Sequence, residues 1–562
     1  MPAFTTSTCS LIHETSFPII APYSFKPPLQ YEVISSILPN NYEVKRLIMP
    51  VADLVLKNAS VITMDTNQPK AELVAISGDK ILLVADNDTL DSVTGTGTRI
   101  IDCCGDAVVP GFIDAHCHIF SFVRKILSID LGPSVVSSIS DIKTAIRNRT
   151  QNTPTGKWVI GTGFNEFHLA EKRLPTRSDI DEIALHHPVV LSHHSLHACV
   201  LNSRALSLAG ITAETPEPPG GLIDRDNTGE PTGILFEMLG YIREKVLPPL
   251  SEEEITRGIS VANQHYLSYG ITSLQEATTG NDYNRWQIFC RIKETGKLQS
   301  RVYMMIGNDT RNRFQEKGLI TGSGDHHLRL GGVKIMLTEI TGELRPAPPE
   351  LDHLSLSCHQ AGFQLAFHAI EESTVEAAVS ALEYVNRHSA ISGRRHRIEH
   401  CSECPPHLIE RLFRLQPVIV TQPPFIYYSG ERYLATVPSE KLKWLYRINS
   451  FINGGLITAG SSDSPVVPDN PLLGIYAAVT RKTRSREQLL PEESISVNQA
   501  IALYTRDAAH ASFEENIKGS ITKDKLADIV VLSDDPTHTN PEQIKGIKVK
   551  MTIVGGKVVW EA

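Results

Sequence analysis

Histidines and one aspartate end four separate apolar runs in this sequence. The first run closes with His116 and His118, and the other three close with His368, His400 and Asp463. Residues two apart in a strand face the same way, so the first pair would point to one side. Converging imidazole and carboxylate groups are the usual ligands of Zn²⁺ and similar ions. Taken singly, each residue is explained as readily by a hydrogen-bonded core histidine or a helix-capping aspartate.

A lysine adds a sixth candidate. Lys334 is the one charged residue in the apolar stretch from Gly332 to Leu337, where a protonated amine would be costly to bury. Burial lowers the pKa of a lysine, and a neutral amine can react with carbon dioxide to give a carbamate, an anion able to bridge two metal ions. Six such residues in or at the ends of apolar runs are hard to explain as coincidence. Together they predict a metal centre.

Eight short apolar stretches carry or flank these residues and are predicted as strands. Amphipathic segments between them predict helices, with capping boxes at Ser251/Glu254 and Ser373/Glu376. Eight parallel strands with alternating helices close into a (β/α)₈ barrel, whose chemistry lies at the carboxyl ends of the strands. A doubly wound open sheet is the alternative, but no GxGxxG follows an early strand. The predicted strands are residues 107–118, 270–277, 301–307, 333–337, 363–369, 396–401, 418–422 and 456–463.

The two ends of the chain predict a second unit. Residues 52–86 and the last 36 residues alternate short β-branched runs with turn signals. We therefore predict an α/β protein in which a (β/α)₈ TIM barrel carries a small composite β-sandwich domain built from both termini. The predicted domains are an N-terminal arm at 1–50, either disordered or packed on the surface, the β-domain at 51–106 plus 515–562, and the barrel at 107–514 with an insertion at about 129–249, rich in loops.

Composition excludes several classes of protein. Among 562 residues, 63 Asp and Glu against 54 Lys and Arg give a net charge of −9, which would repel a nucleic-acid backbone. No stretch reaches the ~18 consecutive apolar residues of a membrane span. The nine cysteines, an odd number, cannot form a closed disulfide framework, which favours a reduced, cytoplasmic protein. We expect no nucleic-acid or membrane partner, and a homo-oligomer stays open.

The sequence around the candidate ligands is more specific than the ligands alone. Val-Val-Pro-Gly-Phe-Ile-Asp-Ala-His-Cys-His ends at His118, and Ala-Gly-Ser-Ser-Asp-Ser-Pro surrounds Asp463. With Ser195-Leu196-His197-Ala198 and Asn470-Pro471-Leu472, these motifs resemble the amidohydrolase superfamily of metal-dependent hydrolases, and more narrowly the branch that contains N-substituted formamide deformylases. The resemblance runs from about Ala52 onward. It implies a (β/α)₈ barrel with a composite β-domain, in agreement with the pattern of strands.

The resemblance also implies roles for the ligands. One or two divalent ions are expected, Zn²⁺ first, with a hydroxide between them. One departure is that many relatives have Asp-Gly shortly after the lysine, where this chain has Leu-Thr-Glu-Ile-Thr-Gly; Glu339 is therefore either an extra acid in the site or a solvated loop carboxylate. The implied ligands are His116, His118 and Asp463 for one ion and His368 and His400 for the second, with carboxylated Lys334 between them.

The expected activity is metal-dependent hydrolysis of a C–N bond, of amide type but not a peptide, in a small molecule. Coordination lowers the pKa of water towards ~7, and the resulting hydroxide could attack the carbonyl. Asp463 would act as general acid/base, passing a proton to the leaving nitrogen. His197, in the insertion, is the first candidate for a substrate-contacting or oxyanion-stabilising residue, and Gln422 the next. For both, a structural role is an equal alternative.

Two other functions stay open. A deaminase of the same superfamily would attack a cyclic amidine and release ammonia. A non-catalytic barrel scaffold is the second alternative, although scaffolds lose ligands and this chain keeps all six. Cys401-x-x-Cys404 has no second CxxC and is predicted as a loop rather than a redox or zinc motif.

Overall fold

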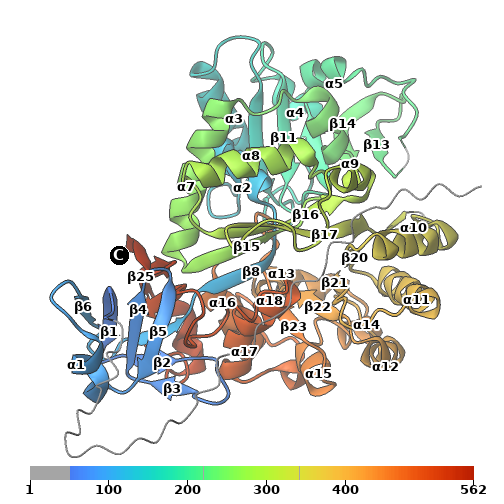
Figure 1. Ribbon diagram of the computed structural model, residues 1–562. Coiled ribbons are helices and arrows are strands. Elements are labelled where there is room, and N and C mark those ends of the chain that lie inside the picture. Colours follow the sequence, from blue (N-terminus) through green and yellow to red (C-terminus); the bar gives the residue numbers. More distant parts are fainter. Residues whose placement is uncertain (1–50, 219, 341) are drawn as a thin grey trace, which may run out of the picture. The chain divides into compact units, whose positions relative to one another are not determined.

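A computed structural model of the protein describes residues 51–218, 220–340 and 342–562 (Figure 1). The predicted N-terminal arm, residues 1–50, lies outside the described residues. The eight predicted barrel strands form one parallel sheet in chain order, so the prediction of an α/β TIM barrel is confirmed. The strands are β8 (Phe112–Cys117), β15 (Ile271–Glu276), β16 (Arg301–Gly307), β17 (Leu328–Met336), β20 (Leu365–Ala369), β21 (Arg397–His400), β22 (Val418–Thr421) and β23 (Thr458–Gly460).

The first and last barrel strands meet through a short junction rather than a long ladder. Cys117 and Ser464 form an isolated parallel bridge. Two backbone hydrogen bonds accompany it, from Asp463 N to His116 O (2.9 Å) and from His118 N to Ser464 O (2.8 Å). The barrel therefore closes at the same residues that the sequence singles out as ligands.

Helices follow the strands around the barrel. The predicted capping box is present at the start of α7, where Glu254 N donates to Ser251 Oγ (3.2 Å) and Ser251 N donates to Glu254 Oε2 (2.8 Å). The principal helices are α2 (Ile119–Leu127), α7 (Glu252–Ser268), α8 (Tyr283–Glu294), α9 (Arg311–Glu316), α10 (Pro348–Gln360), α11 (Glu372–His388), α12 (Pro406–Leu415), α13 (Pro424–Thr436), α15 (Ile448–Asn453), α16 (Pro471–Thr480), α17 (Val497–Leu503) and α18 (Arg506–Ala511).

The second predicted capping box is wrong. Helix α11 begins at Glu372, before Ser373, so that serine lies inside the first turn. Its hydroxyl donates instead to the carboxylate of Glu339, on the hairpin of β18 (Thr338–Ile340) and β19 (Glu343–Arg345). A tertiary partner for the serine thus replaces the local cap that the sequence pattern suggested.

The predicted strand 107–118 is two strands in two sheets. Strand β7 (Ala107–Pro110) pairs antiparallel with β24 (Ile529–Leu532), whereas β8 enters the barrel. Gly111 separates them, and a Cβ there would lie 2.2 Å from Thr272 Oγ1, so the chain can change sheets only at a glycine.

Strands from both ends of the chain pair in one sheet. Its order is β26-β25-β24-β7-β2-β3, and a second sheet has the order β5-β4-β1-β6. Apolar residues of both sheets share one core, which includes Leu56, Val74, Val108 and Ile553. The remaining strands are β1 (Leu54–Lys57), β2 (Ser60–Ile62), β3 (Lys70–Ala71), β4 (Leu73–Ser77), β5 (Lys80–Ala85), β6 (Arg99–Asp102), β25 (Val549–Val554) and β26 (Lys557–Glu561).

The insertion holds a six-stranded sheet in the order β13-β14-β12-β11-β10-β9, which is more regular than the loop-rich segment expected from the sequence. Its strands have two to six residues, and glycines interrupt the longest, so no sustained alternation marks them. It has a core of its own. Its elements are β9 (Ile129–Asp130), α3 (Ile139–Gln151), β10 (Val159–Phe164), α4 (Arg177–Asp181), β11 (Val189–His193), β12 (Ala198–Leu201), α5 (Ser203–Ala209), β13 (Leu222–Arg225) and β14 (Pro231–Phe236).

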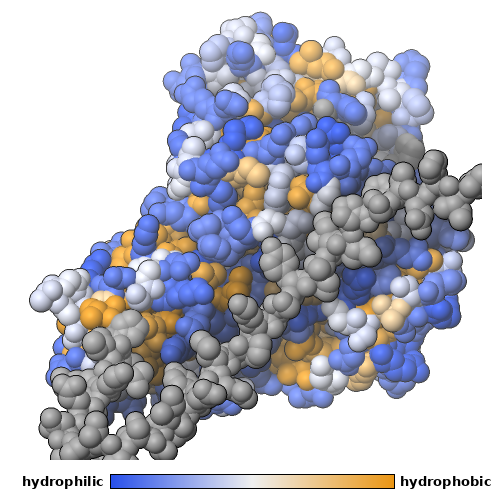
Figure 2. Space-filling view, viewed as in Figure 1, coloured by the Kyte–Doolittle hydropathy of each residue, from blue (hydrophilic) through white to orange (hydrophobic). Residues whose placement is uncertain are grey.

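The surface is mixed in character. Figure 2 shows hydrophilic residues over much of α7, α8 and the insertion, with hydrophobic residues in smaller areas between them. Among the described residues, no helix is both long enough and apolar enough to cross a bilayer.

Candidate metal centre

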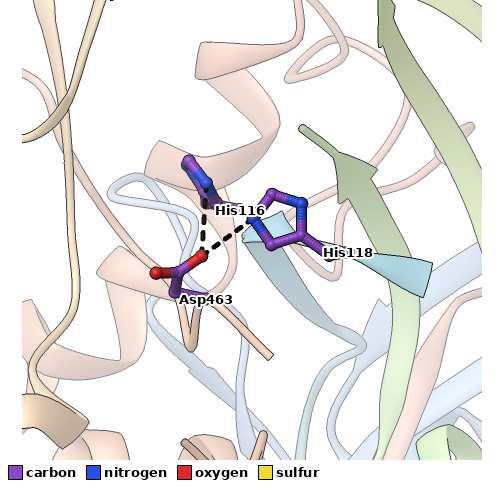
Figure 3. A group of neighbouring side chains, drawn as sticks. All are labelled: His116, His118 and Asp463. Carbon is purple, nitrogen blue, oxygen red and sulfur yellow. Dashed lines mark ion pairs between the residues drawn. The ribbon is translucent and has the colours of Figure 1, made fainter. Parts of the chain in front are cut away.

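Three of the predicted ligands converge at the carboxyl end of the barrel. Asp463 Oδ1 lies 3.0 Å from His118 Nε2 and 3.4 Å from His116 Nε2 (Figure 3). Ligand atoms from the three residues all lie within 4.8 Å of one another, an arrangement that could hold a metal ion. The strand-end pattern in the sequence therefore translates into a compact His-His-Asp group.

Local backbone geometry turns these side chains inward. His118 is the N-cap residue of α2, directly after β8 ends at Cys117. Asp463 lies in the left-handed region at φ 59°, and His400 does so at φ 71°. Non-glycine residues adopt this conformation at a cost, and they are held there by surrounding structure, often at functional sites.

Hydrogen bonds on the far side of each ring fix the direction of the two histidines. His116 Nδ1 lies 2.6 Å from Glu399 Oε2, and His118 Nδ1 lies 2.9 Å from Thr278 Oγ1. Both contacts leave Nε2 facing Asp463. Partners of this kind orient metal-binding imidazoles and raise their basicity.

Glu399 is itself held by a buried arginine. Arg397 donates to Glu399 from Nε (2.7 Å) and Nη2 (3.0 Å), and both side chains are fully buried. Neither residue of this pair is among the site residues predicted from the sequence. The available signal was an Arg and a Glu two residues apart in an apolar strand, which places both on the inner face of the barrel.

The second predicted group lies against the first. The ring centroids of His368 and His400 are 4.4 Å apart, and those of His116 and His400 are 4.9 Å apart. Lys334 Nζ lies 3.3 Å from His116 Nε2. The structure thus brings all six predicted ligands to one end of the barrel.

Gln422 contacts one histidine of this group. It is fully buried, its Oε1 lies 2.8 Å from His400 Nδ1, and its Nε2 donates to Ser461 Oγ (3.0 Å). Both ends of the amide therefore have protein partners. Substrate contact by Gln422 stays a prediction, while its contact with His400 is direct.

The protonation states suit metal ligands. Burial lowers the pKa of His116 and His368 well below the usual value, and that of His400 to about 4. Burial alone would raise the pKa of Asp463, but the hydrogen bond from His118 and the charges of nearby imidazoles outweigh it and lower the pKa. Neutral imidazoles and an ionised carboxylate are the forms that bind cations.

One atom in particular fits a cation. His400 Nε2 is buried and has no hydrogen-bond partner among the described residues. A buried polar nitrogen without a partner is costly, and a metal ion would satisfy it. The donor set of four imidazoles and a carboxylate matches the preferences of Zn²⁺ and similar ions.

His197 lies in the insertion, between β11 and β12. Its Nδ1 lies 2.9 Å from Glu237 Oε1, and its side chain remains 45% exposed. The hydrogen bond to Glu237 raises the pKa of His197, and the negative charges of Asp463 and Glu371 add to this. His197 is the one predicted site residue that the insertion supplies.

Comparison with known proteins identifies the family. A model of the amidohydrolase family matches residues 99–560, which is most of the chain. The chain belongs to the amidohydrolase family. The resemblance drawn from the motifs is thereby confirmed, and this amidohydrolase is a hydrolytic enzyme.

Two curated relatives match it over nearly their full length. It is 28% identical to N-substituted formamide deformylase of Arthrobacter pascens, over 91% of this chain and 98% of that protein. It is 30% identical to the protein LONG AFTER FAR-RED 3 of Arabidopsis thaliana, over 91% and 92%. In fold, it is similar to an uncharacterized metal-dependent hydrolase from Pyrococcus horikoshii OT3, with a TM-score of 0.71 and 23% identity over 87% of this chain and 99% of that one.

Proposed function

We propose that this amidohydrolase cleaves a non-peptide C–N bond of amide type in a small molecule. The observation that carries the proposal is the His-His-Asp group, whose Nε2 and carboxylate oxygen atoms converge while protein partners hold the opposite sides of both rings. The similarity to a formamide deformylase over nearly the whole chain supports the bond type.

One or two divalent ions, Zn²⁺ first, would be held by the six residues. His116, His118 and Asp463 would hold one ion, and His368 and His400 a second. A bound ion of this kind lowers the pKa of water and polarises a carbonyl group. Lys334 would join the two sites as a carbamate, because burial lowers its pKa to about 8 and so favours the neutral amine that reacts with carbon dioxide.

The chain's own groups would manage protons and charge. Asp463, whose Oδ1 lies 3.0 Å from His118 Nε2, would accept a proton from the attacking water and return it to the leaving nitrogen. His197 would donate a hydrogen bond from Nε2 to the developing oxyanion, since Glu237 occupies its Nδ1 and favours the protonated ring. Gln422 would act by orienting His400, with a direct substrate contact as its alternative role.

The test is a hydrolysis screen with metal determination. Purified protein, assayed with added Zn²⁺, is offered N-formyl amines, N-acyl amines and cyclic amides, and both formate or acid release and ammonia release are followed. We expect bound divalent metal, acid release, and loss of both in Asp463→Asn and His118→Ala proteins that keep their circular dichroism. Ammonia released from cyclic amidines alone would favour a deaminase, and full activity in a metal-free preparation would overturn the proposal.

A further inference from the structure

A cavity of about 730 Å³ is lined in part by residues that closely follow the candidate ligand Asp463 in the chain. The insertion supplies one wall, with Asn165, Phe167 and His194, and the segments after β22 and β23 supply the other. Its volume lies within the ~300–1,000 Å³ typical of small-molecule sites. None of the residues that line it belongs to the six candidate ligands.

The cavity and the metal centre share their framework. Pro465 and Val466 line the cavity immediately after Asp463 and Ser464, and Val466 N donates to Asp463 O (2.9 Å). Lys125 lines it from α2, the helix whose N-cap residue is His118. This shared framework is the basis for assigning the cavity to the non-reacting part of a molecule whose scissile bond lies at the metal centre.

Aromatic and uncharged groups form much of the lining. Phe167, Tyr427 and Tyr428 all face it, and the two tyrosine rings meet edge to face with centroids 5.1 Å apart. Burial lowers the pKa of His194 to about 3, so this ring is neutral at physiological pH. Such a lining favours a planar aromatic group, because ring edges and faces pack well against one another.

Two arginines give the opening a positive charge. Arg432 and Arg484 line the cavity and are exposed, and neither forms an ion pair within the described part of the chain. The acidic residues of the lining accept backbone hydrogen bonds, Asp130 from Gly132 N (2.8 Å) and Glu431 from Ser485 N (2.7 Å), and keep their charge. With Lys125, the two arginines outnumber them by three charges to two. The Arg432 guanidinium carbon lies 4.9 Å from the centroid of the Tyr433 ring. Both guanidinium groups are exposed and can bind a carboxylate, whose geometry they match.

We infer that this cavity selects amides of aromatic amines that carry a carboxylate, with the ring against Phe167 and Tyr428 and the carboxylate at Arg432 and Arg484. The inference rests on the proposed C–N hydrolase function and specifies its substrate class. It assigns Arg432 and Arg484 as specificity residues, remote from the reacting atoms.

The first test compares matched substrates on the full-length, metal-loaded protein. We expect kcat/KM for 4-formamidobenzoate to exceed those for formanilide, which lacks the charge, and for 4-formamidobutanoate, which lacks the ring, by about tenfold. Arg432→Gln/Arg484→Gln should lose the preference for the charged compound through a higher KM and leave formanilide unchanged. Arg486→Gln, which removes an exposed arginine outside the cavity lining, is the matched control and should behave as the wild type.

A second measurement separates the cavity from the chemistry. Binding of 4-aminobenzoate and of aniline is measured by calorimetry without turnover, and we expect tighter binding of the carboxylate that the double variant abolishes. If no amide is hydrolysed but this binding is found, the cavity assignment stands and the proposed hydrolysis falls. If amides are hydrolysed without preference and the double variant binds 4-aminobenzoate as the wild type does, the cavity assignment is overturned alone. If neither hydrolysis nor binding is found, both the proposed hydrolysis and the cavity assignment are overturned.

Discussion

Glu399 Oε2 lies 2.6 Å from His116 Nδ1 in a part of the barrel where both side chains are closed to solvent. Arg397, on the same strand, forms an ion pair with this glutamate, so the partner of His116 Nδ1 is itself held in place. The arrangement fixes both the tautomer and the orientation of the imidazole, leaving Nε2 to face Asp463.

Weakening this support is expected to weaken metal binding. Glu399→Gln keeps the shape but removes the charge, and we expect the affinity for Zn²⁺ to fall about 10- to 100-fold, as for comparable supporting groups. Competition with a chromogenic chelator measures the affinity. The matched control is Glu410→Gln, an exposed glutamate of α12. Equal affinity in the Glu399→Gln and control proteins would show that the contact does not support a bound ion.

The contact between His197 and Glu237 predicts a pH dependence. The raised pKa of His197 extends the imidazolium form to higher pH than for an ordinary imidazole, so activity that needs this proton should decline as the pH rises through that pKa. Glu237→Gln removes the main cause, so the alkaline limb of kcat/KM should move to lower pH. Glu166→Gln is the control, because Glu166 lies 2.8 Å from His193 in the same insertion. An unmoved limb in Glu237→Gln would exclude His197 as the group that titrates.

The hydrolytic activity lost on replacing Lys334 should be partly restored by added carboxylic acids. Lys334→Ala removes the amine and should abolish hydrolysis, and short carboxylic acids such as propionate should restore some of it by supplying an anion in the vacated space. A rate that rises with propionate and saturates is the expected readout. Asp463→Asn serves as the control and should show no recovery, because its defect lies in a different group.

A buried ion pair between the barrel and the C-terminal strands predicts acid sensitivity. Arg301 Nε lies 2.6 Å from Asp528 Oδ2, and both side chains are buried. Burial alone would raise the pKa of Asp528, but the charge and hydrogen bonds of Arg301 outweigh it and lower the pKa below the unfolded value of ~3.9. The carboxylate therefore adds stability above ~pH 4, and this stability is lost as the pH falls through the lower folded pKa.

Breaking that pair should be costly near neutrality. Asp528→Asn leaves Arg301 buried without a counter-charge, and we expect a loss of about 3–5 kcal/mol in the free energy of unfolding. Urea unfolding at several pH values measures it, and the gap between variant and wild type should narrow on acidification. Asp534→Asn, an exposed change nearby, should cost little. A gap that widens in acid would contradict the assigned direction of the pKa.

The strand-end residues could be predicted because their approach to one another hardly depends on the path of the connecting loops. Parallel strands of a barrel all end at one rim, so His118, His400 and Asp463 must approach one another wherever the loops run. The supporting residues were not predictable in this way. The partner of His116 lies 283 positions away, and nothing local distinguishes Glu399 from any other strand glutamate.

Two local sequence patterns are overridden in the structure for the same physical reason. The capping box at Ser373 failed because Glu339, 34 positions earlier, competes for the hydroxyl. The division of 107–118 into two strands depends on the approach of Thr272 to Gly111. Each is a contact distant in sequence that overrides a local preference, as is general for elements held by tertiary packing.

The junction between the first and last barrel strands has a consequence for folding. Asp114 and Ser462, which bond across it, are 348 positions apart, so the loop to be closed is nearly the whole barrel. Closing so long a loop is slow, and its contacts are among the last to be gained. During synthesis, His116 and His118 are therefore made long before Asp463. An ion bound by all three residues would stabilise the barrel only once its final strand is in place.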